Sequence, residues 1–176
     1  MRSGWALDDS TFNKVFELLP IGKTILELGS GESTKLFKEK GYNVISIEHD
    51  INFINQVKNV QYIHAPIIGW SKGNKIPRSL EKRFPEAKGW YDPKTIRKYL
   101  PNNYDFIIVD GPTREFGRIG FYIHFDLFRH DVPIIFDDMH RSDDLMLARI
   151  VAEKLERDLL VTNNKKGYKP FGLVLP

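Results

Sequence analysis

Residues 24–34 read TILELGSGEST, in which an apolar run ends at Leu28 and meets two glycines, Gly29 and Gly31. The run from Thr24 to Leu28 has the composition of a β-strand, and a helix candidate, 34–40, follows the glycines. A strand, a glycine turn and a helix in this order indicate the first unit of an α/β fold with a parallel sheet.

Four further apolar runs repeat the pattern and also end in small or acidic residues. Near-continuous Val, Ile, Leu and Phe, without strict alternation, is typical of strands that are covered on both faces. We therefore predict a doubly wound, mostly parallel α/β sheet, to which the C-terminal region adds two strands. The predicted strands are 24–28, 43–47, 60–64, 104–109, 132–136, 159–163 and 171–175, and the predicted helices are 34–40, 51–58, 93–100 and 142–157.

The sequence also predicts where two of these helices begin. Ser142 is expected to cap the last helix, with Asp143 and Asp144 at the positive end of its dipole. Asp92 followed by Pro93 is the pattern of a cap and a first-turn proline.

Composition limits the classes of function. With 176 residues, 41% of them apolar, the chain is expected to form one domain, 1–176, with a substantial core. The absence of cysteine excludes disulfides, a thiolate nucleophile and cysteine-based metal sites. No run approaches about 18 apolar residues and the N-terminal stretch is interrupted by polar residues, so we expect a soluble, cytoplasmic protein without a membrane partner. The net charge of +3 permits an anionic partner without requiring one.

The segment 67–103 is much longer than the usual connections of α/β units. Its first part, 67–91, is predicted to be a lid or a substrate-contact insertion. Trp90 and Tyr91 within it are predicted to contact the substrate.

The composition of this insertion leaves a second interpretation open. Between residues 70 and 98 there are nine basic and three acidic side chains, interleaved with aromatic rings. Such a mixture also suits RNA, although no RNA-binding module accompanies it. A substrate pocket would be completed by Trp5, Phe12 and the insertion, or by a second copy of the chain in a homodimer.

The glycine turn favours a nucleoside ligand that carries no phosphate. Gly29 and Gly31 let the backbone turn sharply and let a ligand lie against it. A dinucleotide-binding turn would have glycine or alanine where Thr34 stands. Two carboxylates, Glu27 and Glu32, flank the turn and suit positive charge. S-adenosylmethionine (SAM) carries a sulfonium and an ammonium and no phosphate.

An acidic residue stands where a ribose would be held. Glu48 ends the second predicted strand, 17 residues after Gly31. Its two oxygens suit the paired hydroxyls of a ribose. SAM is therefore the predicted ligand, and a nicotinamide dinucleotide is the alternative.

The segments ILELGSGEST, VISIEHD, YDFIIVDGP and VPIIFDDMHR, in this order and spacing, resemble the motifs of class I SAM-dependent methyltransferases. The resemblance extends from about Thr24 to the end of the chain. The pattern ELGSGxST, with VDGP and DDxxR after it, is similar to a poorly characterised subgroup of that family. The resemblance implies a Rossmann-like, seven-stranded sheet whose last strand is antiparallel. It further implies that Glu27, Gly29, Ser30 and Gly31 line the methionine end of SAM, that Glu48 holds the ribose with His49 beside it, and that His64 and Ala65 lie near the adenine.

Three acidic residues end neighbouring strands: Asp110 after the fourth, and Asp137 and Asp138 after the fifth. Because the carboxyl ends of parallel strands meet at one edge, we expect the three carboxylates to converge. Similarity to catechol-type O-methyltransferases implies that all three bind Mg²⁺. Alternatively, Asp110 contacts the SAM ammonium, while Asp138 caps a turn or pairs with Arg118 or Arg141. In a third interpretation, Asp110 or Asp138 is a general base.

Other polar residues at this edge have two interpretations each. His140 is a further candidate general base, although a lone histidine in a turn is more often a surface residue. Arg114, Arg118 and Arg141 suit an anionic acceptor such as a carboxylate or a phosphorylated sugar, or they neutralise the aspartates.

The predicted function is methyl transfer from SAM to a small-molecule or sugar-type acceptor, at oxygen. A SAM-binding or RNA-contacting protein without catalytic activity is the main alternative. An NAD(P)-dependent oxidoreductase is a weaker one, because Thr34 and the acids flanking the turn disfavour it.

Overall fold

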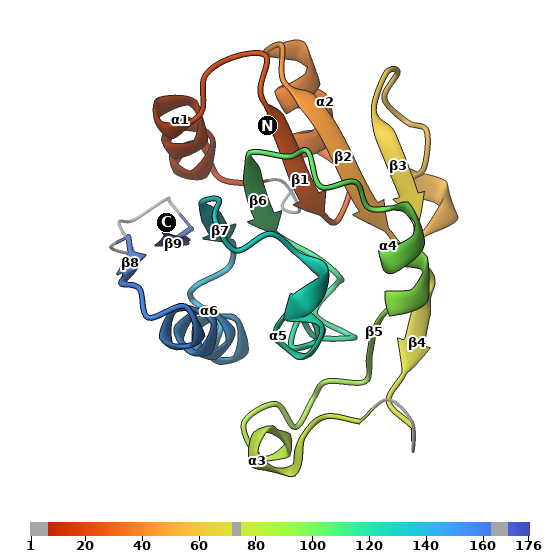
Figure 1. The fold of residues 1–176 in the computed structure, drawn as a ribbon, viewed down its shortest axis with the longest axis vertical. Coiled ribbons are helices and arrows are strands. Elements are labelled where there is room, and N and C mark those ends of the chain that lie inside the picture. Colours follow the sequence, from red (N-terminus) through yellow and green to blue (C-terminus); the bar gives the residue numbers. More distant parts are fainter. Residues whose placement is uncertain (1–6, 72–74, 163–168) are drawn as a thin grey trace.

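The computed structural model describes residues 7–71, 75–162 and 169–176, and a seven-stranded sheet lies at its centre (Figure 1). The strand order is β3-β2-β1-β6-β7-β9-β8, with β9 antiparallel to both of its neighbours and the other adjacent pairs parallel. The predicted doubly wound, mostly parallel α/β sheet is thus confirmed. The strands are β1 Thr24–Leu28, β2 Asn43–Glu48, β3 Gln61–His64, β6 Phe106–Val109, β7 Ile134–Phe136, β8 Leu159–Val161 and β9 Gly172–Val174.

Two apolar clusters cover the two faces of the sheet. On one face, α1 and α2 pack on the strands through Phe12, Val15 and Phe37. On the other face, α4, α5 and α6 contribute buried side chains such as Ile96 and Leu147. Because both faces are covered, the carboxyl-end edge of β1, β2, β6 and β7 is where polar groups gather. The helices are α1 Asp9–Leu18, α2 Glu32–Glu39, α4 Pro93–Tyr99, α5 Gly120–Ile123 and α6 Ser142–Lys154, with 3₁₀ turns η1 Ile51–Phe53 and η2 Phe125–Leu127.

The described residues of the insertion, 67–71 and 75–91, form an arm that is packed against the body of the protein. Its ends, β4 (Ile67–Gly69) and β5 (Gly89–Tyr91), pair antiparallel in a separate two-stranded sheet. A short helix, α3 (Arg78–Glu81), lies between them, at the end of the molecule away from the seven-stranded sheet (Figure 1). Leu80 and Phe84 of the arm are buried in the same apolar cluster as the sheet.

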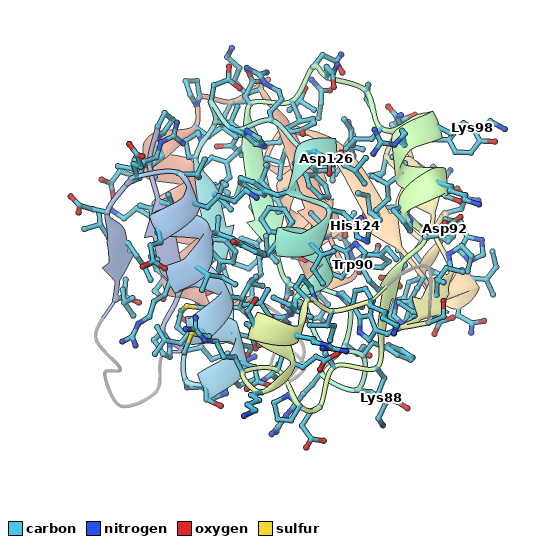
Figure 2. The ribbon with its side chains drawn as sticks, turned by 60° about the horizontal axis from the view of Figure 1, so that its bottom comes forward. Lys88, Trp90, Asp92, Lys98, His124 and Asp126 are labelled. Atoms are coloured by element: carbon cyan, nitrogen blue, oxygen red, sulfur yellow. The ribbon has the colours of Figure 1, made fainter. Side chains whose placement is uncertain are left out.

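The position of Trp90 corrects one prediction. Trp90 is 0% exposed, and a Cβ on Gly120 of α5 would lie 2.0 Å from its ring. Figure 2 shows Trp90 within the body of the molecule, whereas Lys88 and Lys98 lie at its edge. Trp90 is therefore a core residue that packs on the Gly120 backbone, and not a residue exposed to a substrate.

The helix predicted over 51–58 is wrong beyond its first residues. Only η1 forms, and Asn55 and Asn59 have φ values of 61° and 59°. Residues in this left-handed region end a right-handed helix.

The helix starts are partly as predicted. Asp92 caps α4 by accepting a hydrogen bond from the Lys94 amide at 3.1 Å, with Pro93 in the first turn. Ser142, however, is the first residue of α6, whose N-cap is Arg141 with no side-chain capping bond.

The structure describes one of the two residues proposed for a substrate pocket, and that residue belongs to the core. Trp5 lies outside the described residues. Phe12 is 3% exposed and packs against Phe16 and Phe37 in the core. In the described ranges, no helix has the length and apolar character needed to cross a membrane.

Candidate functional site

The buried side chain of Glu27 supports the glycine turn after β1 through hydrogen bonds. This side chain is 0% exposed and accepts hydrogen bonds from the hydroxyls of Ser33 and Thr34, the latter at 2.5 Å. Thr34 Oγ1 in turn accepts from the Gly31 amide at 3.0 Å. The Glu27 carboxylate thus fixes the turn through these hydrogen bonds, and its predicted contact with a ligand stays a prediction. Burial raises the pKa of Glu27 to about 7, although the two hydroxyls partly oppose this rise.

Glu48 joins the end of β2 to the same turn. Its Oε2 accepts a hydrogen bond from the Ser30 amide at 2.7 Å, and its Oε1 accepts from the amides of His49 and Asp50 at 2.6 and 2.8 Å. The His49 ring lies with Nδ1 at 2.7 Å from Oε1. Burial acts to raise the pKa of Glu48, but the hydrogen bonds from His49, Asp50 and Ser30 outweigh it and lower that pKa. Glu48 is thus an ionised acceptor, and Oε2 accepts a single bond in the described structure.

A cavity of about 480 Å³ opens at the carboxyl ends of β1, β2, β6 and β7. We call it the strand-end cavity. It brings together most of the residues that the sequence predicted for a ligand site. Its lining includes Gly29, Ser30, Gly31, Glu48, His49, Asp110, Arg118, Asp137, Asp138 and Arg141.

Three predicted residues lie elsewhere. Ala65 is 0% exposed, and its amide donates to the Glu48 carbonyl at 2.8 Å. His64 is exposed and its Nε2 lies 3.0 Å from the His49 carbonyl. Neither lines the strand-end cavity. His140 is exposed and lines a second cavity described below.

The three predicted aspartates converge, as the parallel sheet requires. One oxygen from each of Asp110, Asp137 and Asp138 lies within 4.8 Å of the others, so the three could hold a metal ion. Asp137 Oδ1 and Asp138 Oδ1 are buried and accept no hydrogen bond in the described structure. Asp138 itself has a φ of 61°, which sets its side chain at the tight turn after β7.

Arg118 already supplies a cation to this group. Its Nη2 lies 3.2 Å from Asp110 Oδ1 and 3.1 Å from Asp138 Oδ2. Its Nη1 lies 3.5 Å from Asp144 Oδ1, and Arg141 Nη1 lies 2.7 Å from Asp138 Oδ2. Arg118 is 7% exposed, so these contacts are shielded from water.

Burial and mutual repulsion shift the titration of the acids. Burial and the neighbouring carboxylates raise the pKa of Asp110 well above its usual range, against the opposing effect of Arg118. For the same reasons the pKa of Asp137 rises to about 6. Desolvation opposes charge on Arg118, but the surrounding acids, Asp144 first, raise its pKa further. The group therefore retains unsatisfied negative charge that an additional cation or a proton would relieve.

Tyr91 is the most informative residue that the sequence placed only roughly. It was predicted to contact a substrate; it is 0% exposed and forms part of the floor of the strand-end cavity. Its buried hydroxyl has no hydrogen-bond partner in the described structure. Burial, then the negative charge of Glu48, raises the pKa of Tyr91 well above 10, so the phenol stays protonated.

The strand-end cavity is also lined by Glu32 and Arg114, which the sequence singled out for charged ligands. Six further lining residues were not predicted as site residues: Asp50, Phe53, Gly111, Pro112, Thr113 and Lys169. Lys169 is part of the charged group, because its Nζ lies 4.0 Å from Asp138 Oδ1.

A second cavity of about 610 Å³ lies between the insertion, the segment after β6 and the start of α6. We call it the insertion cavity. Arg114, Arg118 and Arg141 line both this cavity and the strand-end cavity. The two spaces therefore meet at the arginines.

Comparison with known proteins relates this architecture to one group of enzymes. No family model and no curated protein sequence matches the chain. Among solved structures, a methyltransferase from Pyrococcus furiosus is similar with a TM-score of 0.55 and 16% identity, over 94% of this chain and 80% of that one. A TehB-like SAM-dependent methyltransferase from Corynebacterium glutamicum is similar with a TM-score of 0.51 and 13% identity, over 93% of this chain and 85% of that one.

A third similar structure was solved with ligands. MycE, from the mycinamycin biosynthetic pathway, was determined in complex with Mg, SAH and mycinamycin VI. It gives a TM-score of 0.52 and 14% identity over 94% of this chain, which spans 45% of MycE. The sheet order and these similarities together show that the chain has the Rossmann-like fold of the class I SAM-dependent methyltransferases.

Proposed function

We propose that the chain transfers a methyl group from SAM to a small-molecule acceptor at oxygen. The observation that carries the proposal is the strand-end cavity, which combines the Gly29–Gly31 turn, the ionised Glu48 and the aspartate group in one space. The fold similarity supports methyl transfer in general. The acceptor and the oxygen specificity rest on the residues alone.

The charges around the cavity suit the net charge of SAM. Four carboxylates, from Asp110, Asp137, Asp138 and Asp144, face the side chains of Arg118, Arg141 and Lys169. With all of them ionised, this group has one negative charge in excess, and over the whole cavity lining six carboxylates face four cationic side chains. SAM has one net positive charge, from its sulfonium, ammonium and carboxylate. Its binding would therefore relieve the repulsion that raises the pKa of Asp110 and Asp137.

Individual residues take distinct parts in binding SAM. Gly29 and Gly31 allow close approach to the turn, and Glu48 Oε2 accepts a hydrogen bond from a ribose hydroxyl. Asp110, whose side chain is 19% exposed, accepts from the methionine ammonium. When bound, SAM supplies an electrophilic methyl group on a positively charged sulfur. The protein's contribution is chiefly to hold the acceptor oxygen behind that methyl.

The aspartates also provide for proton removal from an acceptor hydroxyl. Asp138 Oδ2 is occupied by Arg118 and Arg141, which leaves Oδ1. We assign the proton to one of the two oxygens that accept no hydrogen bond in the described structure, Asp137 Oδ1 or Asp138 Oδ1, the latter 4.0 Å from Lys169 Nζ. His140 is further from this role, because it lines the insertion cavity instead.

A Mg²⁺ ion at the aspartates is the second candidate arrangement. The donor set of three carboxylate oxygens within 4.8 Å fits a hard divalent cation, which would orient the acceptor oxygen and lower its pKa. Arg118 competes for the same oxygens. A thermal-shift titration with MgCl₂ separates the two. An increase in Tm that Asp137→Asn abolishes and Asp144→Asn retains would favour the metal, and no increase would favour the protein's own cationic side chains, Arg118 first, as the partners of the aspartates.

The function is tested by isothermal titration with SAM and with S-adenosylhomocysteine (SAH). We expect micromolar binding of both, and Glu48→Ala should weaken it by about 1–3 kcal/mol through loss of a charged acceptor. Glu39→Gln, an exposed change on α2, is the control. Binding of NAD in place of SAM would contradict the proposal and favour the oxidoreductase. SAM binding without SAH formation on any acceptor panel would favour a non-catalytic protein.

A further inference from the structure

The insertion cavity opens directly onto the arginines that border the strand-end cavity. Arg114, Arg118 and Arg141 line both spaces. A molecule in the insertion cavity could therefore present a hydroxyl to Asp138 while the rest of it stays outside the strand-end cavity. With about 610 Å³, the insertion cavity has the size of a small-molecule site.

One side of this cavity is apolar and rigid. Phe84 and Leu147 are 3% and 1% exposed, and Ile119 is 0% exposed. Pro85 and Ala87, from the arm, complete this wall. Because Phe84, Ile119 and Leu147 are fixed by the core, they would hold a flat or apolar body without further ordering.

The three shared arginines differ in how they are engaged. Arg118 pairs with Asp110, Asp138 and Asp144, and Arg141 pairs with Asp138 and Asp144. Arg114, in contrast, is exposed and makes no hydrogen bond or ion pair with any residue of the described ranges. Its guanidinium is thus the cavity cation that is available to a ligand.

The acids of the insertion cavity restrict where an anion can lie. Asp144 faces Arg118 and Arg141, and Asp143 accepts a hydrogen bond from the Ser142 hydroxyl at 3.1 Å. Glu86 is exposed on the arm. A negatively charged group would be repelled at these positions, so Arg114 is the place for it. A guanidinium suits a carboxylate because the two groups can form paired hydrogen bonds.

Building on the methyl-transfer function proposed above, we propose that the insertion cavity binds the acceptor, and that this acceptor is a hydroxylated aromatic or similarly apolar acid whose anionic group is held by Arg114. The apolar wall contacts the ring or apolar part of the acceptor, Arg114 binds its anionic group, and its hydroxyl points to the aspartates. This assignment makes Arg114 a specificity-determining residue.

The test uses SAH-saturated protein and three matched pairs of probes. The acids are 3,4-dihydroxybenzoate, 4-hydroxyphenylacetate and 4-hydroxycinnamate, and each is compared by calorimetric titration with its neutral amide. We expect at least one acid to bind about tenfold more tightly than its amide. Arg114→Gln should remove this preference and leave the affinity for the amide unchanged, in a variant that is again saturated with SAH. Arg83→Gln, on the arm but outside the lining, is the matched control.

A further variant tests whether the acid and the amide bind in the insertion cavity. Ala87→Leu narrows the insertion cavity and should weaken acid and amide alike, again with SAH affinity intact. If SAH binds but no acid binds more tightly than its amide, or if Arg114→Gln keeps the preference, the inference is overturned and the proposed function stands. If SAH itself does not bind, the proposed function fails, and this inference fails with it.

Discussion

The hydroxyl of Tyr91 lies so close to Gly111 that a Cβ at position 111 would come within 2.3 Å of it. The same Cβ would lie 2.8 Å from the Cα of Gly29. Three segments distant in sequence therefore meet here: the turn after β1, the turn after β6 and the last residue of β5. The insertion is in this way part of the floor of the strand-end cavity.

Gly111→Ala should destabilise the protein, because the added methyl meets Tyr91 and the Gly29 backbone, neither of which can move freely. We expect a loss of about 1–3 kcal/mol in the free energy of unfolding, measured with urea. Gly31→Ala is the control in the same site, since a Cβ there meets no atom within 4 Å. Equal stability of the two variants would contradict the close packing at Gly111.

Tyr91→Phe separates the ring of Tyr91 from its hydroxyl. The hydroxyl is buried without a partner, so its removal should change the free energy of unfolding by no more than about 0.5 kcal/mol. If the hydroxyl bonds to SAM, as its place in the cavity floor suggests, SAH affinity should fall by about 0.5–1.5 kcal/mol. Unchanged SAH affinity in calorimetry would limit Tyr91 to packing.

Arg118→Met should be among the most damaging single changes, because it leaves Asp110, Asp138 and Asp144 buried without their shared cation. The free energy of unfolding should fall by about 3–5 kcal/mol at pH 7. The loss should shrink below pH 6, where protonation of the aspartates removes their repulsion, as the raised pKa of Asp137 indicates. Arg97→Met breaks an exposed pair with Asp126 and should cost less than about 1 kcal/mol. Similar losses for both would contradict the burial of the Arg118 group.

The parts of the fold that the sequence predicted correctly are those encoded locally. The strands of the seven-stranded sheet were found because apolar residues run without alternation, as in 106–109, and such runs fit strands buried on both faces. The convergence of Asp110, Asp137 and Asp138 followed from one rule, that parallel strands present their carboxyl ends together.

The errors arose where tertiary contacts decide the outcome. β4 (IIG) and β5 (GWY) were not predicted, because glycine interrupts each apolar run and their pairing joins the two ends of the insertion. Trp90 was predicted to contact a substrate, but the space over Gly120 buries it in the core. Tyr91 is buried over Gly111, where it lines the strand-end cavity. The placement of Arg118 among acids from β6, β7 and α6 depends on long-range contacts that no local pattern contains.

Glu27→Gln should change how stability depends on pH. In the folded protein the pKa of Glu27 is about 7, against 4.5 for a free side chain, so the folded state holds its proton more tightly than the unfolded chain. The contribution of this proton to the free energy of unfolding is therefore fully present below pH 4.5. That contribution, on the order of 3 kcal/mol, is lost as the pH rises to about 7. Glutamine cannot ionise, so the stability of the variant relative to the native protein should increase between pH 4.5 and 7. Urea unfolding at a series of pH values measures this difference. Glu39→Gln, exposed on α2, should follow the native curve. Parallel curves for Glu27→Gln and the native protein would show that Glu27 titrates alike in both states, and that the hydroxyls of Ser33 and Thr34 fully offset its burial.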